Sequence, residues 1–310
     1  MALSTYLAQW VRDVRNVRPA TIRAYNVAIA RISPVIGHVT LADLSPVHVE
    51  RLIRTLGEWG LAPKTVASTH STLRRALKHA VRQRLIGYNP ASAEFVDAPR
   101  VPPKEPRALS RDEVRRLLEA ARGHRFERLI RVALGTGLRS GELRGLSWDD
   151  VDLERGVLHV RYNLRREPGP TRRTGRYFRD QPKTRRGVRD VPLSPTLVQV
   201  LREQREALIA QGFVPTGTGP VFPNTRGGPL HSDALLHGLQ QLLEAAGLPR
   251  LAVRNLRTTF STRLFEAGIP ERRIRDLLGH AENSKVTHSH YIGPGEDWSA
   301  ALRVVEGLVG

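Results

Sequence analysis

A tyrosine near the end of the sequence has the chemistry to attack a phosphodiester. Tyr291 follows Ser289 and His290 in a chain with 49 Lys and Arg against 30 Asp and Glu. A tyrosine hydroxyl can hold a broken phosphodiester end covalently, without a metal or a nucleotide cofactor. The attack builds negative charge on the non-bridging phosphate oxygens, so positively charged donors must already surround them. A lone tyrosine indicates nothing, and the hypothesis depends on cationic stretches upstream.

Arg139 lies in the first of these stretches. Gly135, Gly137 and Gly141 predict a tight turn at which a helix begins. Glu142, three residues after Arg139, could hold the guanidinium in place. An arginine in this position can present its planar fork of donors to two phosphate oxygens, and it stays charged at any relevant pH. An ordinary surface ion pair between the two side chains is the alternative.

Three further stretches carry candidate site residues. Arg254 and Arg257 lie three residues apart on one face of a predicted helix start, which could bind phosphate or be a solvated or DNA-facing helix end. Gly279 is expected to end a helix and to expose His280 beyond it, although an isolated histidine there is more often structural. Lys183 is expected at the tip or edge of a hairpin, or it is one lysine among many in a basic loop.

Composition restricts the class of partner. The 310 residues give room for two domains, and the formal net charge of +19 at pH 7 indicates a polyanion. Aromatic residues make up only 5%, which argues against a single-strand binder that stacks bases and favours duplex DNA. A ribosomal or chromatin-type protein could share the charge, but such chains are usually shorter and less apolar. The absence of cysteine excludes thiol catalysis, zinc ribbons and disulfides.

The sequence contains no sign of a membrane or secretory segment. Charged residues interrupt the first 15 positions, so a signal peptide is not expected. No run approaches the ~18 consecutive apolar residues that a membrane helix needs. We therefore expect no membrane partner and a cytoplasmic location.

The elements that must position these residues fall into two regions. Residues 1 to about 90 are expected to be all-helical, and Ser45 with Pro46 is a strong helix start. The second region is expected to be mainly helical with a small β-hairpin or sheet. The pattern predicts helices from 6, at 21–32, from 46, after 63, at 111–122, 126–135, from 141, at 195–210, 232–246, 255–267 and 271–278, and strands at 157–160 and 188–193.

A proline-rich stretch separates the two regions. Prolines at 99, 102, 103 and 106 occur in a segment with little periodicity, which predicts an extended linker. Ser110 with Glu113 then forms a capping box that opens the next helix. We predict a helical DNA-binding domain at 1–88, a linker at 89–106 and a second domain at 107–310.

The fourth predicted helix is unusual in its charge. From Lys64 to Arg84 it carries no Asp or Glu, and Lys64, Arg74, Arg75 and Lys78 are the cations expected to contact DNA. A solvated basic face is the alternative for one helix in isolation. In a chain of this charge, a helix set against phosphates or in a major groove is favoured.

Five features occur in one order along the chain: Arg139, Lys183, the 254–260 stretch, His280 and Tyr291. In this order they resemble the motifs of the tyrosine recombinase (phage integrase) family, over nearly the whole chain. The resemblance implies two domains, a helical core-binding domain and an α+β catalytic domain. It implies a homo-tetramer acting on paired duplex-DNA sites in integration, excision or resolution. Cleavage would proceed through a 3′-phosphotyrosyl intermediate, with no cofactor and no metal.

The resemblance also assigns a role to each residue. Arg139 and Arg257 would bind the phosphate, and Tyr291 would be the nucleophile. Lys183 would give a proton to the departing 5′-oxygen. His280 would donate to the phosphate or help to position it.

One motif departs from the family pattern. Where the family usually has His-x-Leu-Arg-His, Arg254 and Thr258 occupy the two histidine positions. Arg254 can still donate to phosphate but cannot act as a general base at neutral pH, so we expect slower chemistry rather than its loss. The spacing from His280 to Tyr291 is also slightly longer than is usual in the family, and His288 or His290 could compete as the local base. A metal site at these two histidines is disfavoured because no acidic or Cys residue stands beside them.

Two other functions stay open. Arg254 and Thr258 would also suit a catalytically weakened relative that binds specific DNA as an accessory protein. A type IB topoisomerase shares the chemistry, although the two-domain layout disfavours it. At the end of the chain, an apolar face from Trp298 to Val305 predicts a final helix that could dock on a neighbouring subunit or close its own core.

Overall fold

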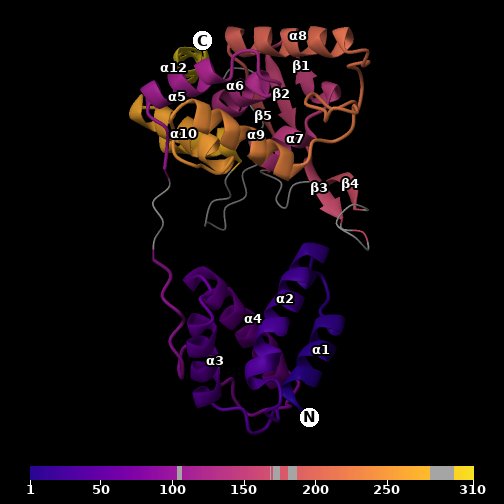
Figure 1. Ribbon diagram of the computed structural model, residues 1–310, viewed down its shortest axis with the longest axis vertical. Coiled ribbons are helices and arrows are strands. Elements are labelled where there is room, and N and C mark those ends of the chain that lie inside the picture. Colours follow the sequence, from indigo (N-terminus) through magenta and orange to yellow (C-terminus); the bar gives the residue numbers. More distant parts are fainter. Residues whose placement is uncertain (103–106, 168, 170–174, 181–186, 280–296) are drawn as a thin grey trace. The chain divides into compact units, whose positions relative to one another are not determined.

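The computed structural model divides the chain into two compact units, Met1–Glu105 and Pro106–Gly310 (Figure 1). It describes residues 1–310 except 103–106, 168, 170–174, 181–186 and 280–296. Each unit has a hydrophobic core of its own. The division falls inside the stretch predicted as a linker, and the linker bounds of 89 and 106 stay a prediction.

The described part of unit 1 contains the helices α1 (Leu3–Asp13), α2 (Pro19–Ile36), α3 (Pro46–Glu58) and α4 (Pro63–Arg82). α2 packs against each of the other three. α2, α3 and α4 begin with a proline, whose fixed φ suits the first helical turn. The predicted start of α3 at Ser45 and Pro46 is confirmed, and the side chain of His48 completes the capping box. His48 Nδ1 accepts from the Ser45 N–H at 3.2 Å.

Apolar side chains from these helices close the core of unit 1. Leu7, Leu52 and Leu77 are fully buried, and each such side chain contributes about 1.5–3 kcal/mol to stability. Tyr6 adds a polar bond, because its hydroxyl donates to Ala76 O at 2.7 Å. Burial raises the pKa of Tyr6 to about 12. The same packing leaves the charged side of α4 exposed.

Unit 2 combines a small antiparallel sheet with a separate hairpin (Figure 1). The sheet has the order β1 (Val151–Asp152), β2 (Val157–Val160), β5 (Arg189–Pro192), and the hairpin pairs β3 (Asn163–Glu167) with β4 (Arg176–Asp180). The strands predicted at 157–160 and 188–193 are confirmed as β2 and β5, with Val160 opposite Arg189. The sequence pattern misses β3 and β4 because charged residues dominate them and leave no apolar alternation.

The other described elements of unit 2 are helical. They are α5 (Arg111–Ala120), α6 (Glu127–Thr136), α7 (Ser140–Gly145), the short η1 (Trp148–Asp150), α8 (Pro195–Ala210), α9 (Ser232–Ala245), α10 (Arg254–Glu266), α11 (Glu271–Leu278) and α12 (Ser299–Val309). The predicted capping box of α5 is confirmed, with the Glu113 N–H donating to Ser110 Oγ at 3.1 Å. Helices with small antiparallel sheets confirm the predicted fold class.

α12 closes the core of its own unit. It packs against α5, α6, α8 and α10, and Ala301, Val305, Leu308 and Val309 are buried there. Arg131 donates to Val309 O, and the Thr196 hydroxyl donates to Glu306. The prediction that the final helix closes its own core is thus confirmed.

Among the described residues, no helix is both long and apolar enough to cross a membrane. The 20-residue α4 exposes Lys64, Arg75 and Lys78 along its length. α4 is therefore long enough to cross a membrane but too highly charged on its exposed side to do so.

Candidate functional site

The turn between α6 and α7 places Arg139. α6 ends at Thr136, and Gly137 follows with φ 61°, in the left-handed region that glycine adopts without steric cost. A Cβ on Gly137 would lie 2.4 Å from Phe260 Cδ1, so α10 packs directly against this turn. Arg139 then takes extended dihedral angles at the N-cap of α7. The predicted tight turn and helix start are confirmed.

Glu142 is the shared partner of the arginines at this turn. Its side chain is 3% exposed, and it accepts from the Arg139 N–H at 2.9 Å and from Arg139 Nη1 at 2.7 Å. Arg189 donates from Nη2 at 3.0 Å, and Arg257 Nη1 lies 4.0 Å away. Burial would raise the pKa of Glu142, but Arg189 and then Arg139 outweigh it and lower that pKa to about 2. The predicted Arg139–Glu142 pair is confirmed, as part of a buried cluster rather than a surface pair.

Arg257 approaches the same carboxylate from α10. Its side chain is 11% exposed, and it donates from Nη1 to Gly137 O at 2.8 Å and from Nη2 to Leu278 O at 2.6 Å. Burial, followed by the charges of Arg139 and Arg189, lowers the pKa of Arg257 to about 9. Three guanidiniums thus share one carboxylate, and the excess positive charge can be neutralised by a bound anion.

The C-terminal end of α11 supplies further acceptors to these arginines. The last carbonyls of a helix have no partner within the helix itself. Gly279, with φ 62°, ends α11 and exposes these groups. Three consecutive carbonyls each accept from a different arginine: Leu277 from Arg189 at 2.6 Å, Leu278 from Arg257 at 2.6 Å and Gly279 from Arg139 at 3.1 Å.

Arg189, the first residue of β5, is the member of this arginine cluster that sequence reasoning misses. Its side chain is 4% exposed. In the sequence it is one arginine among many in the basic run 165–189. Strand alternation is the signal that could have found it, since Arg189 and Val191 share the buried face of β5. A buried arginine needs a carboxylate partner, and Glu142 supplies it.

Arg254 and Thr258 lie at the two positions where the family motif has histidine. Arg254 is exposed at the first residue of α10, and its side chain makes no hydrogen bond or ion pair to the residues that the structure describes. Thr258 Oγ1 donates to Arg254 O at 3.3 Å, a bond within the helix. Arg254 is therefore open to a ligand, and neither side chain joins the arginine cluster.

Three predicted site residues fall outside the described part of the chain. Lys183 belongs to 181–186, and His280 and Tyr291 belong to 280–296. Their roles stay predictions. The structure brings Arg139 and Arg257 together at Glu142. The last described residue of this region is Gly279, directly before His280.

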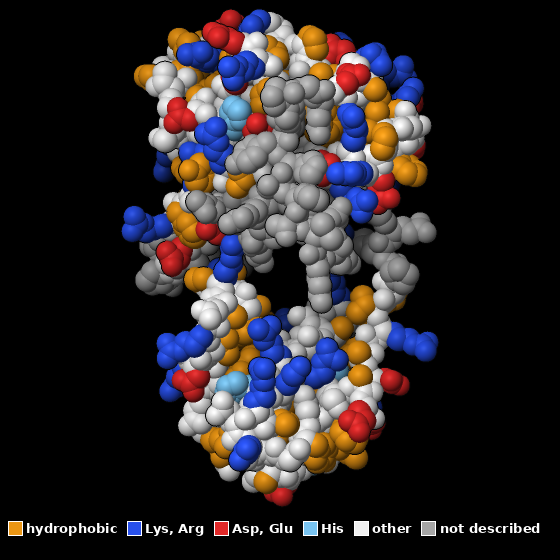
Figure 2. Space-filling view, turned by 180° about the vertical axis from the view of Figure 1, so that it is seen from behind, with side chains coloured by type: hydrophobic (Ala, Val, Ile, Leu, Met, Phe, Trp, Pro, Cys, Tyr) orange, Lys and Arg blue, Asp and Glu red, His pale blue; other side chains and the backbone are white. Residues whose placement is uncertain are grey.

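The cations predicted to contact DNA lie on α4. Lys64, Arg74, Arg75 and Lys78 are all exposed. Figure 2 shows Lys and Arg side chains gathered on the face of unit 1 that is in view. Arg75 also lies over the ring of Tyr25, 5.8 Å from its centroid. This geometry leaves the four cations available to phosphates, and contact with DNA stays a prediction.

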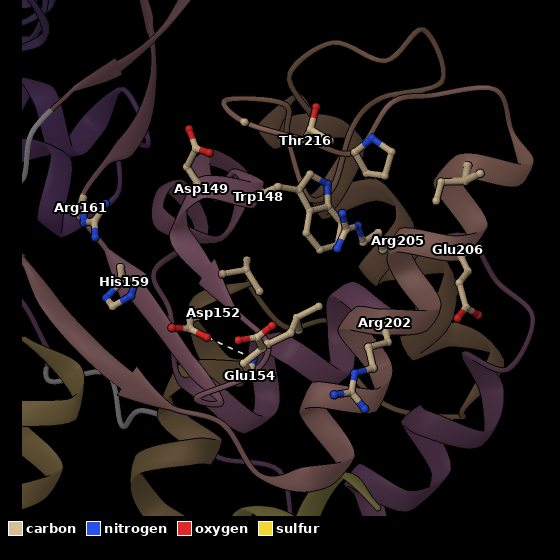
Figure 3. Close-up of a pocket in the computed structure, with 15 residues that line it drawn as sticks. Trp148, Asp149, Asp152, Glu154, His159, Arg161, Arg202, Arg205, Glu206 and Thr216 are labelled. Carbon is tan, nitrogen blue, oxygen red and sulfur yellow. Dashed lines mark hydrogen bonds between the residues drawn. The ribbon is translucent and has the colours of Figure 1, made fainter.

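A cavity of about 830 Å³ lies elsewhere in unit 2 (Figure 3). Trp148, His159, Arg161, Arg202 and Arg205 are among its lining residues, and no predicted site residue is. The cavity is therefore separate from the arginine cluster. Within the described ranges, no group of three or more His, Asp or Glu could hold a metal ion.

Comparison with known families covers both units. The model of the phage integrase family matches residues 107–294, a range that includes the whole arginine cluster. The model of the phage integrase N-terminal SAM-like domain matches residues 2–57 in unit 1.

Named relatives align over most of the sequence. A protein named tyrosine recombinase XerC-like, from Caldanaerobacter subterraneus subsp. tengcongensis, is 29% identical over an alignment of 265 residues that covers 81% of this chain and 68% of that protein. An integrase from Streptomyces ambofaciens is 30% identical over an alignment of 292 residues that covers 90% of this chain and 71% of that protein.

Solved structures share the fold. The Tn1549 transposon integrase in complex with transposon right-end DNA aligns with a TM-score of 0.81 at 23% identity, covering 91% of this chain and 92% of that chain. The lambda integrase tetramer bound to a Holliday junction aligns with a TM-score of 0.68 at 20% identity, covering 94% of this chain and 80% of that chain.

Proposed function

Since the chain belongs to the phage integrase family, we propose that it cleaves duplex DNA with Tyr291 at a phosphate held by Arg139 and Arg257. Its function is that of a site-specific DNA recombinase, which breaks and rejoins DNA strands. One observation carries the assignment of the site. Three guanidiniums share the single carboxylate of Glu142, and the excess positive charge suits a phosphodiester.

Arg139 and Arg257 bind the non-bridging oxygens of the scissile phosphate. A guanidinium has five N–H donors. Arg139, 39% exposed, directs Nη1 to Glu142 and Nη2 to Gly279 O and has donors left for a phosphate oxygen. Because protein acceptors orient these donors before DNA arrives, little reorganisation is needed as charge develops on the phosphate.

The covalent step exchanges one phosphoester bond for another. Tyr291 Oη attacks the scissile phosphorus, the P–O5′ bond breaks, and the 3′-phosphate stays on the tyrosine. The hydroxyl proton passes to a nearby base or to water during the attack, because a free tyrosine has a pKa near ~10 and is protonated at neutral pH. Lys183 gives a proton to the departing 5′-oxygen, and His280 donates to the phosphate. A 5′-hydroxyl of a second DNA end then attacks the phosphotyrosine and releases Tyr291, so no cofactor is required.

In the proposed function, the two units correspond to two domains with different roles. Residues 1–88 form the core-binding domain, in which Lys64, Arg74, Arg75 and Lys78 contact DNA phosphates, and residues 107–310 form the catalytic domain. A homo-tetramer acts on two paired sites, in the cytoplasm. The lambda integrase of the same fold, which is a tetramer on a Holliday junction, supports this assembly.

A catalytically weakened DNA-binding accessory protein is the second candidate. Arg254 and Thr258 favour it, because neither position supplies an imidazole, and Thr258 bonds back to its own helix. A recombination assay separates the two functions, with sites first selected by binding from random-sequence DNA. The wild type is expected to exchange strands between two such sites, and Tyr291→Phe is not. Binding without exchange would favour the accessory protein, and relaxation of supercoils without exchange would favour a topoisomerase.

A further inference from the structure

Arg189 joins three parts of unit 2 at the arginine cluster. From β5 it donates through Nε to Leu277 O at 2.6 Å, through Nη1 to Gly187 O at 3.3 Å and through Nη2 to Glu142 at 3.0 Å. Its side chain is 4% exposed, too little for contact with a DNA phosphate. Any effect of Arg189 on strand cleavage must therefore pass through the groups that it bonds.

Two of these groups are close in sequence to the proposed donors Lys183 and His280. Gly187 comes four residues after Lys183, and Leu277 comes three residues before His280. β5 itself is held in register by its pairing with β2. A single side chain thus connects a paired strand to the end of a helix, at the two points where the chain continues toward Lys183 and toward His280.

A buried arginine could contribute to stability alone. Two of the groups that Arg189 bonds, however, are also linked to the arginines that are proposed to bind the phosphate. Glu142, which Arg189 bonds, also accepts twice from Arg139. Leu277, which Arg189 bonds, is followed by the carbonyl that accepts from Arg257. Loss of Arg189 would therefore release the carboxylate and the helix end that orient both phosphate-binding arginines.

We propose that Arg189 is a positioning residue for DNA strand cleavage. It fixes the end of α11, which is followed in sequence by His280, and it fixes Glu142 against Arg139 and Arg257 without touching the DNA. The proposal rests on the proposed function, in which those two arginines hold the scissile phosphate.

Arg189→Lys and Arg189→Met test the two connections. Lysine keeps a positive charge beside Glu142, so the buried carboxylate stays paired and the fold is expected to persist. An ammonium group does not reproduce the planar fork that bonds Leu277 O and Glu142 together. Displacement of catalytic groups by about 1 Å can cost ~100-fold in rate, so we expect Arg189→Lys to cleave roughly 10- to 100-fold more slowly at unchanged DNA affinity. Arg189→Met, which loses both bonds, is expected to be slower still.

The pH profile gives a readout that loss of stability alone would not produce. Glu142 is faced by Arg139 from the start of α7, by Arg189 from β5 and by Arg257 from α10. Methionine at 189 leaves two arginines to oppose burial, so the pKa of Glu142 rises. Cleavage by Arg189→Met should then be lost at a higher pH on the acid side than cleavage by the wild type or by Arg189→Lys.

The measurement is single-turnover formation of the covalent adduct on a nicked duplex that carries a selected site. DNA affinity and folded fraction are determined for each variant at each pH. Arg202→Met, which changes an exposed arginine of α8, is the matched control and is expected to cleave at the wild-type rate. Slow cleavage by folded, DNA-bound Arg189→Lys supports the proposal. Wild-type rates for both variants, or losses that vanish after correction for folded or bound protein, overturn it. A wild type without any adduct contradicts the proposed function itself.

Discussion

A single carboxylate, Glu142, lies among three guanidiniums at 3% exposure. Its folded-state pKa of about 2 lies below the ordinary value of 4.5. A carboxyl group with a lowered pKa stabilises the folded state fully above its unfolded-state pKa, and this contribution disappears as pH falls through the folded-state value. The charge of Glu142 is therefore expected to stabilise unit 2 above about pH 4.5 and to stop doing so as pH approaches about 2.

Replacement of this carboxylate should cost stability in a pH-dependent way. Glu142→Gln leaves three arginines, two of them buried, without their shared acceptor charge, so we expect a loss of roughly 3–5 kcal/mol in the free energy of unfolding at pH 7. The difference from the wild type should shrink between about pH 4.5 and 2. Chemical denaturation across this pH range measures it, with the exposed Glu206→Gln on α8 as the control. A difference that is independent of pH would contradict the assignment.

Arg254 gives a prediction about the missing general base. Arg254→His restores an imidazole at the position where the family motif has one, and general-base assistance typically contributes ~10²–10⁴ in rate. We expect Arg254→His to cleave at least about tenfold faster than Arg254→Asn at pH 8, and to lose this advantage as pH falls through about 6.5, where the imidazole becomes protonated. Adduct formation on a nicked duplex measures both rates. Equal rates at all pH values would show that proton removal does not use this position.

At the scale of elements, the cluster depends on how one helix ends and another begins. Gly137 ends α6 and Gly279 ends α11, both in left-handed conformations. Each turn brings a backbone carbonyl to an arginine, with Gly137 O bound by Arg257 and Gly279 O bound by Arg139. The two helix ends thus orient the side chains that the proposed reaction uses.

Alanine at Gly137 should disturb this arrangement. It would combine a strained φ of 61° with a Cβ 2.4 Å from Phe260 Cδ1, and we expect a loss of roughly 2–5 kcal/mol in stability together with slower cleavage. Gly57→Ala in α3 is the matched control, because nothing lies within 4 Å of its Cβ. That variant should gain up to about 1 kcal/mol. Thermal unfolding compares the two, and equal effects would contradict the account of the turn.

The sequence predicts these elements to the extent that local pattern determines them. Helices and the strands β2 and β5 follow from apolar spacing, and Arg139 follows from its glycine-rich turn. β3 and β4 escape prediction because their residues are mainly charged. The role of Arg189 could not be predicted for another reason. It depends on Glu142 and Leu277, which are remote in sequence, and only folding brings the three residues together.

At the scale of the whole molecule, charge is distributed over two units that each bury a core of their own. The net charge of +19 draws the chain to DNA without sequence information. α4 in unit 1 supplies exposed cations, whereas Arg189 and Arg257 of the cluster in unit 2 are largely buried. We therefore expect affinity and catalysis to respond to different substitutions.

A double substitution on α4 tests this separation. Arg75→Gln with Lys78→Gln removes two cations proposed to bind phosphates, so binding should weaken at all salt concentrations, and the slope of log affinity against log salt should fall by about 1 for each phosphate that is no longer neutralised. The rate of cleavage at saturating protein should stay unchanged. Arg51→Gln with Arg54→Gln, exposed on α3, is the control pair. An unchanged slope for the α4 variant would place the DNA elsewhere.

In the proposed reaction Tyr291 becomes covalently bound to DNA. The direct measurement is to trap the protein on a nicked duplex, digest the complex, and identify by mass spectrometry both the modified residue and the attached DNA end. We expect a 3′-phosphate joined to the oxygen of Tyr291, and no adduct with Tyr291→Phe. An adduct on another residue, an attachment through a 5′-end, or an adduct that persists in Tyr291→Phe would contradict the proposed reaction.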